Sequence, residues 1–195
     1  MGRNRSYDEH AVLCGAMHAF RRKGYQAVSI RDLEEATGLK AGSIYNSFGD
    51  KAGLFDAAFI HYNRVILGGR IGRHAPMEAG LDGLRALFLS LLHEPNEETF
   101  GCLITNIAVE LGGDAPSHPC VADGLAMLTR TFADRLAAAR DAGGLRAGIT
   151  PGGTAVKLLA LYQGLLVLIR ADHDSTALER LVNDEFNDLE ARHDA

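Results

Sequence analysis

The residues of this chain best suited to chemistry with a partner lie between Ser29 and Phe48. Their pattern predicts two short helices joined by a tight turn at Gly38. Ile44 and Phe48 are four residues apart and would share the inner face of the second helix. The outer face then carries hydroxyl, amide, cationic and very small groups, which can enter a DNA major groove and hydrogen-bond to base edges and phosphates. An ordinary helical hairpin with a polar surface is the alternative interpretation.

Helix starts in this region carry their own signals. Ser29 is a candidate N-cap, and Asp32 follows three residues later, a spacing typical of a capping box. Asp50 is the candidate N-cap of the helix that follows the pair. Lys51 comes at the first turn of that helix, where backbone N–H groups point outward. A cation beside such amides can hold a phosphate group.

The same stretch resembles a known family. Residues 36–55, which contain Ala-Thr-Gly-Leu-Lys and Ser-Ile-Tyr-Asn-Ser-Phe, are similar to the helix-turn-helix of TetR-type transcriptional regulators. Residues 20–25, Phe-Arg-Arg-Lys-Gly-Tyr, resemble the end of that family's first helix. Asn46 and Ser47 depart from the pattern, because the family often has aromatic or histidine residues there.

The resemblance implies a helix-turn-helix domain at residues 1–52 and a helical ligand-binding and dimerisation domain at residues 53–195. It implies double-stranded operator DNA as a partner and an unknown small molecule as the effector. We expect one group of side chains to hold the DNA backbone: Ser29, Thr37, Tyr45 and Lys51. A second group is expected against the bases: Lys40, Gly42, Ser43 and Asn46, with Arg31 and Ala41 completing the DNA-contacting set.

Long stretches with alanine, leucine and arginine at helical spacing, and few β-branched runs, favour an all-α protein with about nine helices. The 195 residues are 47% hydrophobic and 23% charged, which is ordinary for a globular chain. The N-terminus is polar, and the apolar run Val156–Ile169 is expected to be too short and interrupted to cross a bilayer. Three cysteines without CxxC spacing fit a reduced cytosol better than a disulfide framework. We therefore expect a cytoplasmic protein without a membrane partner.

Charge is unevenly distributed along the chain. The net charge is −5, but residues 1–51 carry +2 and the remainder carries −7. A basic head on an acidic body suits a protein that presents one end to DNA.

The helices expected after the first three span about 50–68, 81–92, 100–112, 120–142, 154–171 and 175–192, with a domain break between Gly68 and Pro76. The run within 154–171 is apolar nearly all round, so it needs cover on two sides. We expect the last two helices to form a four-helix homodimer interface, although the buried centre of a monomer is the alternative. The expected interface residues are Leu158, Leu161, Leu165, Leu168, Leu178, Leu181 and Phe186.

Several polar or aromatic side chains on apolar helices are candidates for lining a ligand pocket. They are Phe59, Tyr62, Cys102, Asn106, Glu110 and Tyr162. The Gly-Cys-Leu start at residues 101–103 resembles one TetR-type subgroup, some of whose members sense electrophiles or oxidants through a cysteine. A thiol at a helix N-terminus is also favoured as thiolate, whereas a buried structural cysteine is the alternative.

Catalytic, cofactor and metal motifs are not recognised in the sequence. His118 and Cys120 with Asp114 and Asp123 match no usual zinc spacing, so no metal site is expected. We expect no enzyme activity and no cofactor. The function expected is a ligand-responsive repressor released from its operator by a small molecule. Alternatives are an electrophile-sensing repressor acting through Cys102, a small helical enzyme, or a helical interaction scaffold without DNA affinity.

Overall fold

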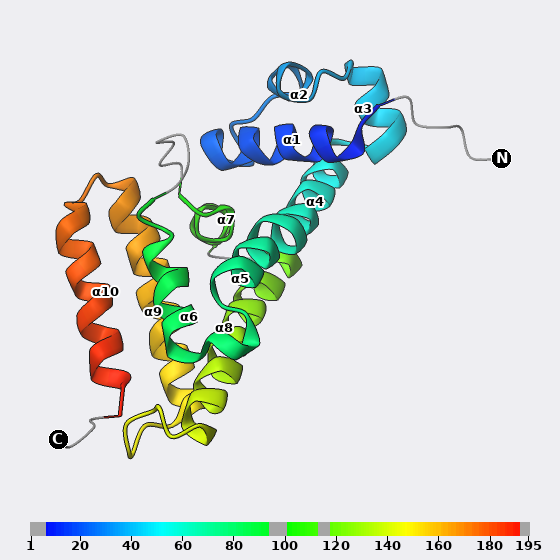
Figure 1. Ribbon diagram of the computed structural model, residues 1–195. Helices are drawn as coiled ribbons and strands as arrows, with labels where there is room; N and C mark the ends of the chain where they lie inside the picture. Colours follow the sequence, from blue (N-terminus) through cyan, green and yellow to red (C-terminus); the bar gives the residue numbers. More distant parts are fainter. Residues whose placement is uncertain (1–6, 94–100, 113–117, 192–195) are drawn as a thin grey trace. The chain divides into compact units, whose positions relative to one another are not determined.

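The computed structural model describes residues 7–93, 101–112 and 118–191. Helices dominate these residues, and the extended pairing among them is limited to an isolated antiparallel bridge between Leu145 and Glu190. The all-α expectation is confirmed. The elements are α1 (Glu9–Lys23), α2 (Ile30–Thr37), α3 (Ala41–Phe48), α4 (Lys51–His61), a π-helix (Tyr62–Leu67), α5 (Gly68–His74), a 3-10 turn (Met77–Ala79), α6 (Gly80–Leu89), α7 (Leu103–Glu110), α8 (Pro119–Asp141), α9 (Pro151–Arg170) and α10 (Ser175–Leu189) (Figure 1).

The chain divides into two compact units. The first unit comprises residues 1–66 and 102–121, and the second comprises residues 67–101 and 122–195. The first unit therefore holds α1 to α4 together with α7. The division into two domains between residues 52 and 53 stays a prediction.

The boundary between the two units, after Ile66, lies close to the break expected between Gly68 and Pro76, but the helix does not end there. Helical residues continue from Lys51 to His74, through the π-helix at Tyr62–Leu67. Two glycines lower helix propensity by about 1 kcal/mol each but do not remove a hydrogen-bond donor. The helix ends at Ala75, with φ −128° and ψ 55°, because the following Pro76 disfavours the helical conformation of the residue before it.

The core of the first unit is built on α1. Four residues on its inner face are buried: Val12, Ala16, Ala19 and Phe20. The Phe20 ring packs edge-on against Phe55 of α4, with ring centroids 5.0 Å apart. This packing fixes α4 against α1, and the short helices α2 and α3 complete the unit.

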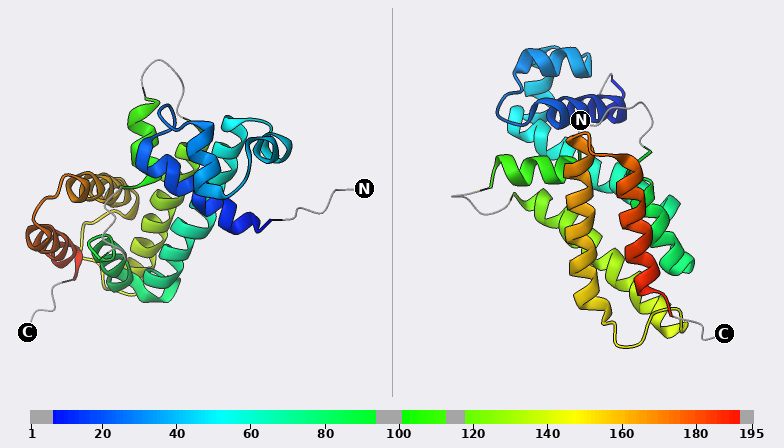
Figure 2. Two further views of the ribbon diagram at one scale, coloured as in Figure 1. Left: turned by 90° about the horizontal axis from the view of Figure 1, so that it is seen from above. Right: turned by 90° about the vertical axis from the view of Figure 1, so that its left-hand side faces the viewer.

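Aromatic rings form the core of the second unit. The Phe88 ring of α6 contacts Phe132 of α8, Tyr162 of α9 and Phe186 of α10 at centroid distances of 5.3 to 5.4 Å. Helices α9 and α10 run side by side (Figure 2), and Lys157 pairs with Glu185 across them at 2.7 Å. All four helices therefore share one hydrophobic core.

This core corrects the expected dimer interface. Four of the seven residues assigned to it are buried inside the second unit itself: Leu158, Leu165, Leu178 and Phe186. Leu161 and Leu168 are half-buried, while Leu181 is 44% exposed. The sequence shows that α9 is apolar on every side, but it does not show which side the monomer covers. The face that stays uncovered consists of Val156, Ala160, Gly164 and Val167.

Helix α9 is also long and apolar enough to cross a membrane, by length and composition alone, and no other helix in the described part of the chain is. The expectation that this run is too short is therefore wrong, since the helix has 20 residues. Its Leu158, Tyr162 and Leu165 side chains nevertheless lie in the core of the second unit. A core helix with one uncovered apolar face has this composition.

Candidate nucleic-acid interface

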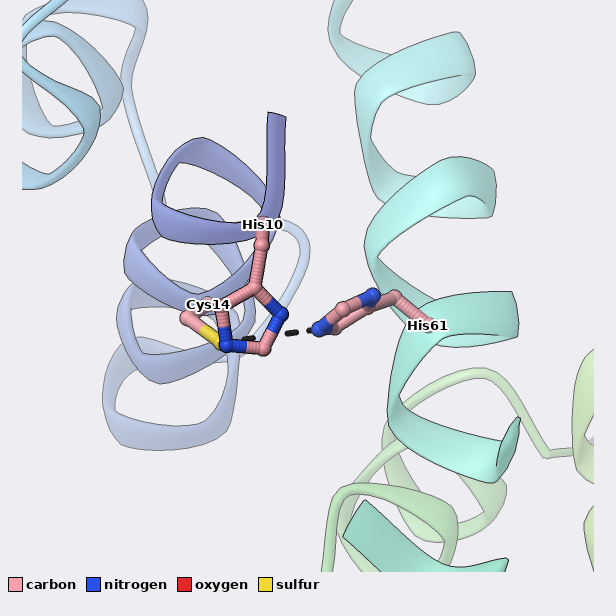
Figure 3. Close-up of side chains that lie close together, drawn as sticks. All are labelled: His10, Cys14 and His61. Atoms are coloured by element: carbon pink, nitrogen blue, oxygen red, sulfur yellow. Dashed lines mark hydrogen bonds between the residues drawn. The ribbon is translucent and has the colours of Figure 1, made fainter. Parts of the chain in front are cut away.

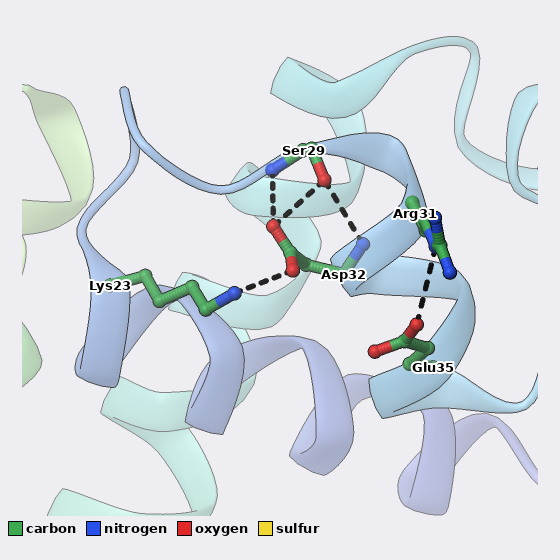
Figure 4. Close-up of polar contacts among 5 residues, drawn as sticks. All are labelled: Lys23, Ser29, Arg31, Asp32 and Glu35. Atoms are coloured by element: carbon green, nitrogen blue, oxygen red, sulfur yellow. Dashed lines mark hydrogen bonds and ion pairs between the residues drawn. The ribbon is translucent and has the colours of Figure 1, made fainter.

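A capping box begins α2 and is tied to the end of α1. The Asp32 N–H donates to Ser29 Oγ at 3.2 Å, and the Ser29 N–H donates to Asp32 Oδ2 at 2.9 Å. Lys23 Nζ lies 2.5 Å from Asp32 Oδ1, so the last turn of α1 is joined to the first turn of α2 (Figure 4). The predicted cap is confirmed, and it orients α2 relative to α1.

Stability of this corner is expected to depend on pH through Asp32. The Lys23 ammonium, followed by the Ser29 N–H and hydroxyl, holds the pKa of Asp32 far below its ordinary range. A depressed folded-state pKa means that the stabilisation is complete above the unfolded-state pKa of about 3.9 and is lost as the pH falls below it. The difference in unfolding free energy between wild type and Asp32→Asn should therefore shrink as the pH falls below about 4.

Urea unfolding of both proteins between neutral and acidic pH measures that difference. Glu35→Gln is the control, because the Arg31–Glu35 pair at 3.5 Å has side chains 86% and 69% exposed and contributes little (Figure 4). A difference that stays constant on acidification would contradict the assignment to Asp32.

Helix α3 presents the expected outer face. Ile44 is fully buried beneath it, whereas Gly42, Ser43 and Asn46 are exposed and Tyr45 is 48% exposed. Beyond these, Lys40 is exposed as the N-cap residue without a side-chain cap bond, and the Ala41 N–H donates to Glu34 Oε1 at 2.8 Å. The small and polar groups thus lie together on the surface, opposite the residue that anchors the helix.

Thr37, a predicted DNA contact, forms hydrogen bonds within the turn before α3. Thr37 Oγ1 donates to the Leu33 carbonyl at 2.6 Å and accepts from the Leu39 N–H at 3.2 Å. Gly38 adopts the left-handed conformation, with φ 71°, which glycine reaches without strain. Thr37 is half-buried and serves the turn geometry, so the structure gives its hydroxyl a local role.

Lys51 lies where α4 meets the connection between α1 and α2. Its Nζ donates to the Gln26 carbonyl at 3.3 Å and lies 4.8 Å from the centroid of the Tyr25 ring. Asp50 caps α4 as predicted by accepting from the Gly53 N–H at 2.8 Å. The phosphate role of Lys51 stays a prediction, and the same cation already steadies this junction.

Two residues predicted to line a ligand pocket have another task. The Glu110 carboxylate accepts from the Tyr25 N–H at 2.8 Å and from the Gln26 N–H at 2.6 Å. Asn106 Nδ2 donates to the Arg21 carbonyl at 3.1 Å. Helix α7 therefore holds the end of α1 and the connection to α2, and a pocket-lining role for both residues stays a prediction. More than 80 residues separate these partners, so no local sequence signal indicates the pairing.

The remaining predicted pocket residues are divided between the two units. Phe59, Tyr62 and Cys102 are buried in the first unit, where Tyr62 Oη lies 3.1 Å from Cys102 Sγ. Tyr162 lies in the aromatic core of the second unit. A pocket of about 400 Å³ in that unit is lined by other residues: Arg70, Arg73, His74, Ala86, Leu89, Ser90 and His93.

His118, just before α8, contacts α4. His118 Nε2 lies 3.1 Å from Asp56 Oδ1, and its ring packs edge-on against Phe55. Asp114, the other candidate considered with it, lies outside the described residues.

Comparisons with known proteins agree with this geometry. Residues 12–58 match the model of bacterial regulatory proteins of the tetR family, and residues 80–184 match the tetracyclin repressor-like C-terminal domain. The repressor ComR of Escherichia coli is 46% identical over 61 residues, covering 31% of this chain and 29% of ComR. The repressor AcnR of Corynebacterium efficiens is 27% identical over 151 residues, covering 77% of this chain and 73% of AcnR.

A solved structure shares the fold. The TetR-family regulator CifR, as a cysteine mutant complexed with 26-base-pair operator DNA, superposes with a TM-score of 0.75 at 23% identity, covering 96% of this chain and 100% of CifR. An N-terminal helix-turn-helix followed by a helical body defines a class of DNA-binding transcriptional regulators. The chain belongs to the TetR family of that class.

Proposed function

We propose that this protein is a cytoplasmic repressor that binds operator DNA as a homodimer and is released by a small molecule. The observation that carries the proposal is the exposed face of α3, where small and polar side chains lie opposite the buried Ile44. The relatives ComR and AcnR are named repressors, and CifR has been crystallised on its operator. The relatives therefore favour repression as the mode of regulation.

Helix α3 supplies the groove contacts in this proposal. A Cβ atom added at Gly42 would meet nothing within 4 Å. Since glycine also has no side chain, a base edge can approach the helix backbone closely at this position. Lys40, Ser43 and Asn46 flank this position with one cation and two hydrogen-bonding groups. Asn46 is suited to a bidentate pair with adenine, and Tyr45 and Ser29 to phosphate contacts.

The uncovered face of α9 supports the homodimer. Val156 is 60% exposed and Val167 is 52% exposed, with Ala160 and Gly164 between them on the same face. Leu181 of the neighbouring α10 adds a side chain that is 44% exposed. A second copy related by a two-fold axis would cover this surface with the same residues. An operator bound by such a dimer would present two half-sites about 34 Å apart, one helical turn of DNA.

The pocket in the second unit supports a small anionic effector. Its volume of about 400 Å³ falls within the usual range for ligand sites. Arg70 and Arg73 give its lining a positive charge, and burial together with these two arginines lowers the pKa of His74. Such a molecule would release DNA only if it bound the DNA-incompetent state more tightly. Cys102, by contrast, is 3% exposed, so electrophile sensing at this thiol has no specific observation in its favour.

Recovery of genomic fragments bound by the full chain tests the proposal, followed by titration of the enriched fragment. Asn46→Ala should cost about 1–3 kcal/mol and relax specificity at one base pair. Lys51→Ala should weaken binding to every sequence and lower the salt slope by about 1. Arg130→Ala, an exposed position on α8, is the control and should bind as wild type. Failure to enrich any fragment over bulk DNA would refute the proposed function.

A further inference from the structure

Three potential metal ligands meet between α1 and α4 in the first unit. His10 and Cys14 are four residues apart on α1 and therefore share one face of that helix. His61, at the end of α4, directs its ring toward them (Figure 3). Cys14 Sγ lies 3.7 Å from His10 Nε2 and 3.5 Å from His61 Nε2, and all three ligand atoms lie within 4.8 Å of one another.

These separations fit coordination to a common ion. Metal–nitrogen bonds of about 2.0 Å and a metal–sulfur bond of about 2.3 Å at tetrahedral angles place sulfur and nitrogen roughly 3.5 Å apart. The two sulfur–nitrogen distances observed, 3.7 and 3.5 Å, are close to this value, and the two imidazole ligand atoms lie within 4.8 Å of each other. We propose that His10, Cys14 and His61 form a binding site for Zn²⁺ that joins α1 to α4.

The ligand set selects the kind of cation. Two imidazoles and a thiolate suit borderline and soft transition metals, whereas Mg²⁺ and Ca²⁺ require oxygen ligands. Three protein ligands leave a fourth position for water.

Binding is coupled to loss of a proton. Zn²⁺ binds a cysteine as the thiolate, so the Cys14 thiol must lose its proton when the ion binds. A thiolate–zinc bond forms as the S–H bond breaks, and the proton passes to solvent. The alternative is a thiol that is hydrogen-bonded to the two imidazoles. Such a thiol would give no thiolate-to-cobalt charge-transfer band.

The site is also independent of DNA. Both helices belong to the unit that contains α3, and a bridging ion would stabilise that unit in proportion to its occupancy. Zn²⁺ binding at this site does not require operator DNA, so the full chain can be titrated without it.

Titration of the metal-free full chain with Co²⁺, a spectroscopic substitute for Zn²⁺, tests the site. We expect a thiolate-to-cobalt charge-transfer band that Zn²⁺ abolishes and an excess of Mg²⁺ does not. Cys14→Ser should remove the band. His10→Asn and His61→Asn should each weaken Zn²⁺ binding by more than about 10-fold, the smallest loss expected when even an outer-shell partner is removed.

His18→Asn is the matched control, because His18 is exposed on the same helix α1. It should leave the band and the affinity unchanged. Zn²⁺ should also raise the Tm of wild type but not that of Cys14→Ser. The proposal is overturned if the band is absent, if it persists in Cys14→Ser, or if His10→Asn, a change at an exposed side chain that leaves the core intact, binds Zn²⁺ as wild type does.

Discussion

Replacing Gly15 with alanine is expected to disrupt the DNA-binding unit and abolish operator binding. A Cβ atom built at Gly15 would lie 2.0 Å from the carbonyl oxygen of Ala36 and 2.9 Å from its carbonyl carbon. Real Cβ contacts are essentially never shorter than 3.0 Å, and the atoms it meets belong to backbone. Helices α1 and α2 must therefore move apart, which costs about 1–3 kcal/mol or more in overpacking.

The sign of this effect is the reverse of the usual one. Alanine in place of glycine within a helix ordinarily stabilises by about 1 kcal/mol. Gly72 of α5 is the matched control, because it is helical and exposed and an added Cβ atom would meet nothing within 4 Å. Denaturant unfolding should show Gly15→Ala destabilised and Gly72→Ala slightly stabilised. Equal stabilisation of the two variants would mean that α1 and α2 are not in close contact at Gly15.

Replacing Val167 with aspartate is expected to convert the proposed dimer into monomers. Val167 is 52% exposed in the single chain and belongs to the uncovered face of α9. In the proposed dimer, two carboxylates would be buried in the interface without partners, which apolar interfaces do not tolerate. A monomer would hold one half-site only, so operator affinity should fall by about 100-fold or more as the benefit of paired binding is lost.

Light scattering coupled to size-exclusion chromatography measures the mass, and operator titration measures the affinity. Val109→Asp is the control, because Val109 is 77% exposed on α7 and outside the proposed interface. That variant should stay dimeric and bind DNA normally. If Val167→Asp remains a dimer with wild-type affinity, the two-fold contact does not involve this face of α9.

Local sequence was sufficient to predict the helix-turn-helix formed by α2 and α3. The Ser29–Asp32 cap, the turn at Gly38 and the position of Ile44 under α3 all depend on residues within four positions of one another. Backbone hydrogen bonds and helical periodicity act over that range, so their outcome is written in the sequence. The resemblance of residues 36–55 to the TetR family depends on the same local geometry.

Longer-range features depended on the fold. The sequence shows that α9 is apolar, but it does not show which side of the helix faces Phe88. It also gives no sign that the Glu110 carboxylate accepts from the Tyr25 and Gln26 amides. The four-residue spacing of His10 and Cys14 is visible in the sequence, whereas His61 joins them only once α4 has packed against α1. Packing decides these matters because apolar burial is non-directional. Many partners satisfy the same hydrophobic face, and only the assembled set of helices selects one.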